Sequence, residues 1–70
     1  MTGLVKRSFT LAGHRTSVAL EPEFWAVLDR LAAASGRPVS ALVAELDAAR
    51  EPEGRPLASL LRVHALKNVG

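Results

Sequence analysis

The first twenty residues carry three basic side chains and no acidic one. The basic residues are Lys6, Arg7 and Arg15, and the hydroxyl of Ser17 follows at the next alternate position. Lysine and arginine neutralise phosphates, and arginine and serine can also hydrogen-bond to the edges of nucleic-acid bases. All seven acidic residues fall between residues 21 and 53, and the tail is basic again, although the formal net charge is only +2. This layout could orient the chain toward a polyanion, and an ordinary solvated surface is the alternative.

Other side chains offer little chemistry. The chain has no cysteine, and its two histidines lie far apart in the sequence without further ligands at the spacing of a zinc site. Ser40 could be combined with Asp47 or His64, but nothing supplies a third group to orient such a set. A chain of 70 residues also has little room for a substrate cavity. We therefore expect a protein that is not an enzyme, with no catalytic residue, no metal site and no cofactor.

Residues 6–20 show the alternation of apolar and polar side chains that is typical of a half-buried β-ribbon. A tight turn is expected near the middle of this segment, where a glycine can adopt positive φ. A two-residue loop at Gly13-His14 would place Phe9 opposite Val18 and all the apolar side chains on one face. A single longer strand, or a disordered first ten residues, is the alternative.

Two helical patterns follow, over residues 22–35 and 38–50. In both, apolar side chains recur at the i, i+3, i+4 and i+7 spacing of an amphipathic helix. Pro22 and Pro38 suit the first turns of the two helices, and Gly36 suits the left-handed residue that ends the first one. The side chains expected in the core or in a dimer interface come from the end of the ribbon and from these two helices: Val18, Leu20, Phe24, Trp25, Leu28, Leu31, Val39, Leu42, Val43 and Leu46.

A linker rich in proline and glycine, residues 51–56, separates a first domain over residues 1–50 from a C-terminal helical extension over residues 57–70. The extension is expected to form a short third helix. Domains this small are marginally stable alone, and without disulfides or a metal site a second copy of the chain is left to complete the core. No run of residues is apolar enough to span a membrane, and the start lacks the apolar region of a secretory signal. We expect a cytoplasmic protein without membrane contact.

The sequence from Thr16 to Ala32 (TSVALEPEFWAVLDRLA) resembles the opening of the ribbon-helix-helix (Arc/MetJ-type) family. Residues 36–43 (GRPVSALV) resemble the turn of that family into its second helix, and the resemblance covers about residues 15–50. It implies an α+β fold in an intertwined homodimer. One strand from each chain would pair antiparallel, the two-stranded ribbon would enter the major groove of double-stranded DNA, and the paired helices would form the shared core.

The resemblance also implies which residues contact DNA. The outward side chains of the strand would read base edges, and the backbone amides at the start of the second helix would hold a phosphate. Apart from the resemblance, the first two basic residues would become phosphate contacts if DNA binds here. In chain order these residues are Lys6, Arg7, Arg15, Ser17, Ala19, Val39 and Ser40. A hairpin in each chain would give the dimer a four-stranded sheet, which is broader than a groove that admits two strands. The first strand would in that case flank the groove.

Two functions fit these features. The first is a dimeric DNA-binding protein that regulates transcription in the manner of a bacterial-type repressor. The second is a protein-interaction module or antitoxin-like protein on the same fold, with residues 51–70 as the contact arm for a partner protein. The acid-free ribbon favours the first function. The second is favoured by the modest net charge and by Ala19, at a position where the family commonly has a long polar or basic side chain.

Overall fold

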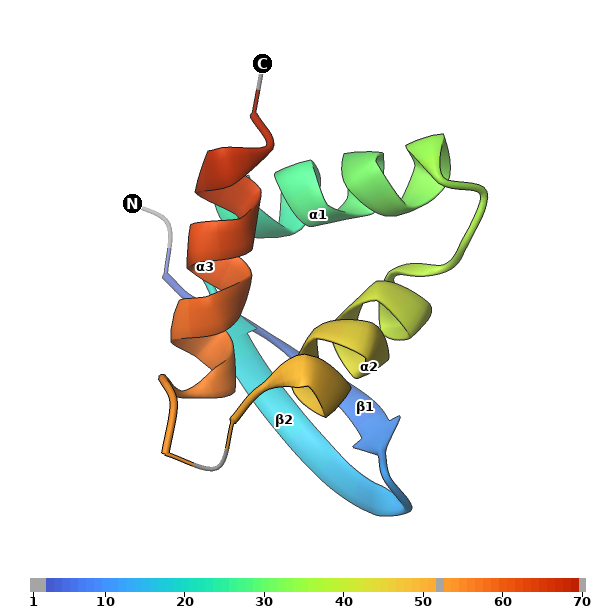
Figure 1. Cartoon of the computed structure of the whole chain (residues 1–70). Helices are drawn as coiled ribbons and strands as arrows, with labels where there is room; N and C mark the ends of the chain where they lie inside the picture. Colours follow the sequence, from blue (N-terminus) through green and yellow to red (C-terminus); the bar gives the residue numbers. More distant parts are fainter. Residues whose placement is uncertain (1–2, 52, 70) are drawn as a thin grey trace.

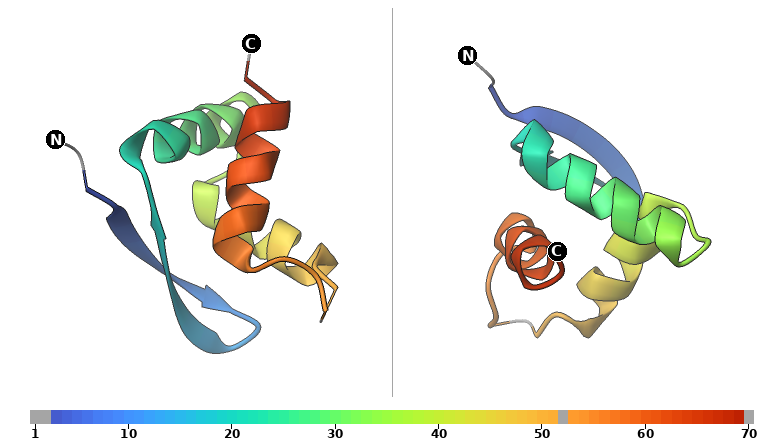
Figure 2. Two further views of the ribbon diagram at one scale, coloured as in Figure 1. Left: turned by 90° about the vertical axis from the view of Figure 1, so that its left-hand side faces the viewer. Right: turned by 90° about the horizontal axis from the view of Figure 1, so that it is seen from above.

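A hairpin of two strands followed by three helices makes up the chain, for which the computed structural model describes residues 3–51 and 53–69 (Figure 1). The hairpin forms one layer, and the helices lie on one side of it (Figure 2). This order confirms the expected α+β fold with an N-terminal hairpin and a short third helix. In chain order the elements are β1 (Val5–Leu11), β2 (His14–Leu20), α1 (Pro22–Ala34), α2 (Val39–Ala49) and α3 (Leu57–Lys67).

Four residues lie outside the described ranges: Met1, Thr2, Pro52 and Gly70. The first two and the last are the outermost ends of the segments expected over residues 1–50 and 57–70. Pro52 belongs to the expected linker. Residues 5–11 form a strand, so neither a single longer strand nor a disordered first segment describes this part of the chain.

The hairpin turns at Ala12 and Gly13, which both have positive φ angles, of 51° and 81°. Positive φ at both central residues is the signature of a type I′ turn, whose twist matches that of the strands it joins. The expected loop at Gly13-His14 is therefore wrong, because His14 is already the first residue of β2. A type I′ turn favours glycine at its second central position, and only the observed loop places Gly13 there.

The register of the hairpin differs by two residues from the expected one. Phe9 pairs with Thr16, and Arg7 pairs with Val18. Because side chains alternate between the two faces of a strand, a shift of two residues keeps every side chain on its expected face. The inner face accordingly buries Phe9, Leu11, Val18 and Leu20 against the helices.

The link between α1 and α2 is a tight reversal around Gly36, which has a φ of 70°. The amide of Gly36 donates to the carbonyl of Ala33, and the amide of Arg37 donates to the carbonyl of Ala32. These two bonds form a Schellman motif, which satisfies carbonyls at the end of α1 and explains the expected stop at this glycine. Pro38, expected inside the second helix, instead caps α2 in an extended conformation, with φ −69° and ψ 155°.

One hydrophobic cluster contains residues from the hairpin and from all three helices. Leu61 and Ala65 of α3 are 0% exposed, as are Leu20 of β2 and Leu28 of α1. The helix of the expected extension therefore packs in the same core as residues 3–50. No helix within the described ranges is both long and apolar enough to cross a membrane.

The side chains expected in the core or in a dimer interface fall into two groups. The first group is buried within the single chain: Val18, Leu20, Trp25, Leu28, Leu42 and Val43. The second group is only half-buried and packs against the edge of the cluster: Phe24, Leu31, Val39 and Leu46.

Candidate nucleic-acid interface

Six side chains project from the hairpin on the side away from the helices, and we call this surface the outer face. Residues that pair across an antiparallel sheet point to the same face. The outer face consists of three such pairs, which are Lys6 with Ala19, Ser8 with Ser17, and Thr10 with Arg15. All of these side chains are exposed except that of Ala19, which is half-buried. The surface carries two positive charges, three hydroxyls and no acidic group.

The two basic residues of the outer face are Lys6 and Arg15. Within residues 3–51 and 53–69, neither Lys6 nor Arg15 forms an ion pair, whereas four other arginines do. The outer face therefore has two cationic groups available to an anion. They lie on different strands and at opposite ends of the hairpin, because Lys6 is near its open end and Arg15 is next to the turn.

The centre of the outer face is a pair of hydroxyls. Ser8 Oγ and Ser17 Oγ lie 3.1 Å apart, and either atom could be the donor. Serine hydroxyls can donate to or accept from base edges. The middle of the surface thus offers neutral, adaptable hydrogen bonding between the two charged ends.

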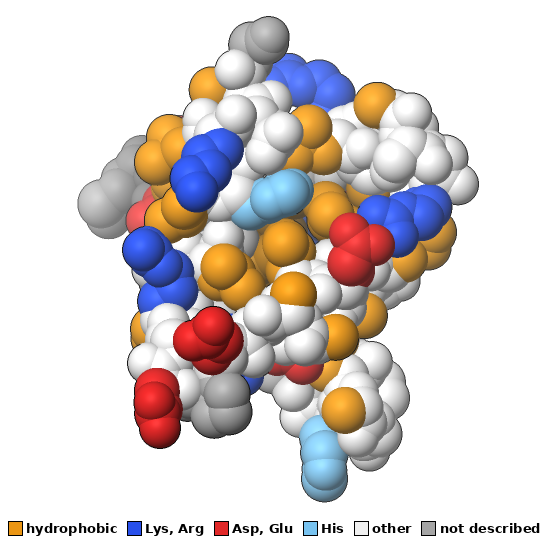
Figure 3. All heavy atoms as spheres, viewed as in Figure 1, with side chains coloured by type: hydrophobic (Ala, Val, Ile, Leu, Met, Phe, Trp, Pro, Cys, Tyr) orange, Lys and Arg blue, Asp and Glu red, His pale blue; other side chains and the backbone are white. Residues whose placement is uncertain are grey.

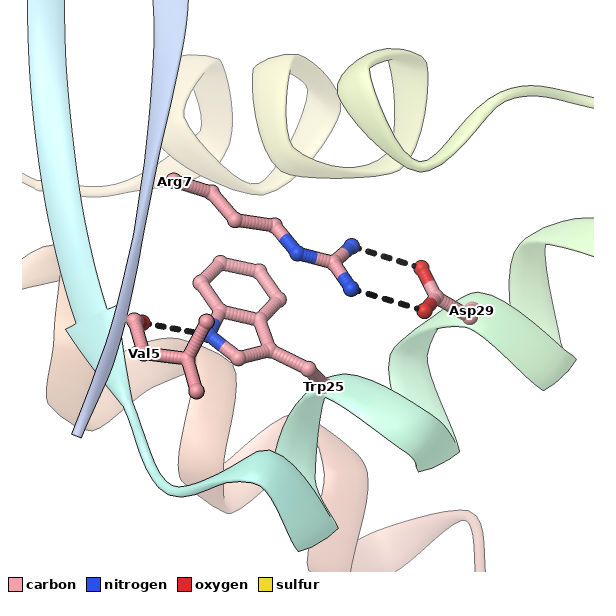
Figure 4. A network of polar contacts seen from close by, with 4 residues as sticks. All are labelled: Val5, Arg7, Trp25 and Asp29. Atoms are coloured by element: carbon pink, nitrogen blue, oxygen red, sulfur yellow. Dashed lines mark hydrogen bonds and ion pairs between the residues drawn. The ribbon is translucent and has the colours of Figure 1, made fainter. Parts of the chain in front are cut away.

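Arg7 does not belong to the outer face. Its guanidinium donates to both carboxylate oxygens of Asp29, at 2.8 and 3.0 Å, and lies 4.6 Å from the ring centroid of Trp25 (Figure 4). The indole Nε1 of Trp25 in turn donates to the backbone carbonyl of Val5 at 2.7 Å. The hydrogen bonds between the two side chains raise the pKa of Arg7 and lower that of Asp29. These contacts between Arg7, Asp29, Trp25 and Val5 hold β1 against α1.

Val39 and Ser40 lie in the helix layer, at the start of α2, and not on the outer face. Val39 is half-buried against the core, and Ser40 is exposed. The amides of the first residues of a helix have no intrahelical acceptor. The first amides of α2 that bond within the chain are those of Ala41 and Leu42, which both donate to the carbonyl of Pro38.

Sequence reasoning left two residues out of the candidate interface, namely Ser8 and Thr10. Both alternate with Phe9, which is buried, and the same alternation that places Ser17 outward places them outward. The same alternation puts Arg7 on the inner face together with Phe9, which the sequence analysis did not use. The signal that could have found these positions was therefore already present in residues 6–11.

No group that could hold a metal ion is found in the described part of the chain, where three or more histidine, aspartate or glutamate side chains nowhere come together. His14 is exposed at the start of β2, and His64 is half-buried on α3. Among the described residues, Ser40 forms no side-chain hydrogen bond with Asp47 or His64.

Comparison with known proteins gives a family and no individual relatives. No match was found among curated proteins or among solved structures. A family model described as a ribbon-helix-helix domain matches residues 4–69, which include both strands and all three helices. Such domains are a non-catalytic, DNA-binding fold that typically dimerises. The chain therefore belongs to the ribbon-helix-helix domain family.

Proposed function

We propose that this chain is a DNA-binding transcription regulator that places the outer face of its hairpin in the major groove. The observation that carries the proposal is that, among the described residues, Lys6 and Arg15 have no acidic partner on a ribbon face without acidic groups. Members of the family are typically DNA-binding regulators or antitoxins. We propose no enzymatic activity and no cofactor for this chain.

The roles of the outer-face residues follow from their chemistry. The guanidinium of Arg15 can donate two hydrogen bonds to a guanine, which is the commonest specific contact in the major groove. Ser17 and its partner Ser8 can reach base edges between the two charged ends, and Lys6 can neutralise a phosphate at the open end. Ala19 offers only a methyl group, which suits contact with the methyl of thymine.

Two further phosphate contacts were expected from the sequence, one at the start of α2 and one at Arg7, and we propose only the first. The free amides of Val39 and Ser40 would bind a phosphate through the positive end of α2. Arg7 would have to give up its two bonds to Asp29 before it could bind a phosphate, so we leave Arg7 out of the proposed interface.

A homodimer is proposed as the active form. Several apolar side chains are only half-buried in the single chain although they pack against the core: Phe24, Val27, Leu31, Val39, Leu46 and Leu60. Hydrophobic side chains gather visibly over the helices (Figure 3). A second copy that covers them would remove apolar surface from water. Sedimentation at micromolar concentration checks this proposal, and a stable monomer would contradict it.

Binding to a partner protein is the second candidate function, because apolar side chains are exposed at the end of α3. Leu66 is 62% exposed and Val69 is 50% exposed. An open hollow of about 240 Å³ also lies between the end of α2 and the start of α3, and its lining includes Leu46, Arg50 and Leu60. An antitoxin-like protein would use this region for its partner and the hairpin for DNA. Ribbon-helix-helix proteins are usually cytoplasmic, and we propose the same location here.

A titration of fluorescent duplex at several salt concentrations tests DNA binding. Arg15→Ala should weaken binding by about 1–3 kcal/mol and relax the sequence preference, because a bidentate base contact is lost. Lys6→Ala should weaken all sequences alike and flatten the slope of log affinity against log salt by about one. Arg30→Ala is the matched control, since Arg30 is exposed on α1 and its loss changes the net charge equally. Failure of the wild type to bind at low salt would contradict the proposal, as would equal losses from Arg15→Ala and Arg30→Ala.

A further inference from the structure

We infer that β1 is a strand that contacts the DNA backbone, while β2 alone faces the bases. In a dimer whose two β2 strands pair at the centre of the sheet, the β1 strand of each chain lies over one wall of the major groove, where Lys6 and Thr10 contact phosphates. The inference rests on the proposed DNA binding and divides the outer face into two parts with different roles. The strand order, the anchoring of β1 and the chemistry of its outward side chains carry it.

The strand order leaves β2 with a free edge. Within the described residues the sheet has two strands, β1 and β2, so each has one neighbour. β2 is followed by α1 after a single residue, and the resemblance to the ribbon-helix-helix family begins within β2. The resemblance implies a ribbon that consists of one strand from each of two chains. In the proposed dimer, the strand that pairs with a second copy is therefore β2, and β1 lies outside it.

The width of the resulting four-stranded sheet places β1 over the backbones of the DNA. Neighbouring strands lie about 4.8 Å apart, so each β2 strand lies about 2.4 Å from the centre of the sheet and each β1 strand about 7.2 Å from it. The major groove is about 12 Å wide, which puts its walls about 6 Å from its centre. The two β2 strands fit between these walls. Each β1 strand lies above one wall, which is a sugar-phosphate backbone.

Contacts with the helix layer keep β1 in the sheet. Phe9 and Leu11 of β1 are 7% and 6% exposed and belong to the core. The ring centroid of Phe9 lies 5.9 Å from that of Trp25, whose indole donates to the carbonyl of Val5. β1 could leave its place beside β2 only by exposing these core side chains. It must therefore stay over the groove wall when the β2 strands approach the bases.

The outward side chains of the two strands suit these two places. β1 presents Lys6 and Thr10, which are both exposed. An ammonium group is a compact point charge that binds phosphate, and threonine hydroxyls also bond to phosphate oxygens. β2 presents Arg15, whose fork of donors matches the edge of a guanine. Ser8 is not included in the assignment, because its Oγ lies 3.1 Å from that of Ser17 on β2.

The register indicates which phosphate each residue contacts. Thr10 pairs with Arg15 across the hairpin, next to the turn. A base contact by Arg15 would therefore bring Thr10 to the backbone beside the same base. Lys6 pairs with Ala19 near the open end, so its phosphate lies farther along the same wall.

Duplexes with single neutral phosphates test the assignment. A duplex that the wild type prefers is first selected from a randomised pool, and methylphosphonates then replace its phosphates one at a time without changing the bases. Thr10→Val and Lys6→Met remove the hydroxyl and the charge and keep the size of each side chain. Each should weaken binding to the unmodified duplex by at least about threefold, because a hydrogen bond to a charged group is lost. The loss should be equal for all base sequences, and it should disappear when the matching phosphate is replaced.

Arg15→Ala is the control for a base contact. Its loss should be smaller on a duplex with 7-deazaguanine, which lacks the N7 acceptor of guanine, and it should persist on the duplexes with methylphosphonates. Circular dichroism checks that all three variants keep the native fold. The inference is overturned if Thr10→Val or Lys6→Met changes the base preference. It is also overturned if no methylphosphonate position removes a loss caused by either of them.

The proposed function and the inference fail in different ways. If the wild type binds no duplex at low salt, the proposed function falls and takes the inference with it. If the wild type binds and Arg15→Ala relaxes its sequence preference, but the two β1 variants behave in one of the overturning ways, DNA binding stands and only the role of β1 is wrong.

Discussion

Arg7 of β1 and Asp29 of α1 are 22 positions apart in the sequence and meet in a two-point ion pair. The two side chains are 35% and 48% exposed, so water screens the pair. The guanidinium of Arg7 lies over the ring of Trp25 in a cation–π contact. The ion pair links β1 to α1, and its contribution to stability depends on the charge of Asp29.

The first prediction concerns the pH dependence of this link. Asp29→Asn should lower the free energy of unfolding at neutral pH by at most about 1 kcal/mol, the range for exposed pairs. The folded-state pKa of Asp29 is lowered, so the stabilisation is present above the pKa of the unfolded chain and is lost as the pH falls through the folded-state pKa. Urea unfolding at neutral and acidic pH measures the difference. Glu53→Gln, at an exposed position, is the control, and a deficit of Asp29→Asn that persists in acid would contradict the explanation.

The second prediction concerns the role of α3. Leu61→Ala should lower the free energy of unfolding by about 2–5 kcal/mol, because the side chain is 0% exposed and its removal leaves a cavity. Leu66→Ala on the same helix should change it by no more than about 0.5 kcal/mol, because that side chain is 62% exposed. Equal effects of the two substitutions in urea unfolding would show that α3 is not part of the core.

The third prediction concerns the turn. Gly13→Ala should destabilise the protein by about 1–2 kcal/mol, because a side chain disfavours the left-handed backbone that Gly13 adopts. The added Cβ would meet no atom within 4 Å, so the effect would be conformational and not steric. Gly3→Ala, at a position with equally open space and no positive φ, is the control. Thermal unfolding of both variants compares them, and a neutral Gly13→Ala would argue against the type I′ turn.

The fourth prediction concerns Ala19, which lies directly across the hairpin from Lys6. Ala19→Arg should raise DNA affinity. If the new guanidinium contacts one phosphate, it should also steepen the slope of log affinity against log salt by about one. The same change should slightly lower the stability of the free protein, because like charges directly opposite in a sheet repel each other. Anisotropy titrations and urea unfolding measure the two effects separately. A variant that is folded and gains no affinity would indicate that this end of the ribbon does not approach DNA.

The pattern of apolar residues predicted the elements and the faces of the hairpin, because alternation with period two or 3.6 is a local property of the sequence. It could not distinguish the two registers, because both place Phe9 and Val18 on the inner face. That choice depends on the turn, where glycine is favoured at the second central position and Ala12 accepts a positive φ. Local chemistry at two residues therefore decided the register of fourteen paired ones.

The candidate interface was only partly predictable for a different reason. Arg15, Ser17 and Ala19 face outward as the alternation indicates. Arg7 forms an ion pair with Asp29, which lies near it only because α1 packs against the sheet. Long-range pairs of this kind have no signal in the spacing of residues along the chain.

Ser8 and Ser17 occupy the centre of the outer face, with their oxygens 3.1 Å apart and either of them able to be the donor. When one hydroxyl gives its hydrogen to the other, only the second keeps a hydrogen for an outside acceptor, and rotation about two C–O bonds exchanges these roles. A guanidinium, by contrast, presents a fixed set of donors. The central pair can therefore invert its polarity without moving the backbone. On DNA it would tolerate an acceptor on either side of the groove floor, and discrimination between sequences would be concentrated at Arg15, next to the turn.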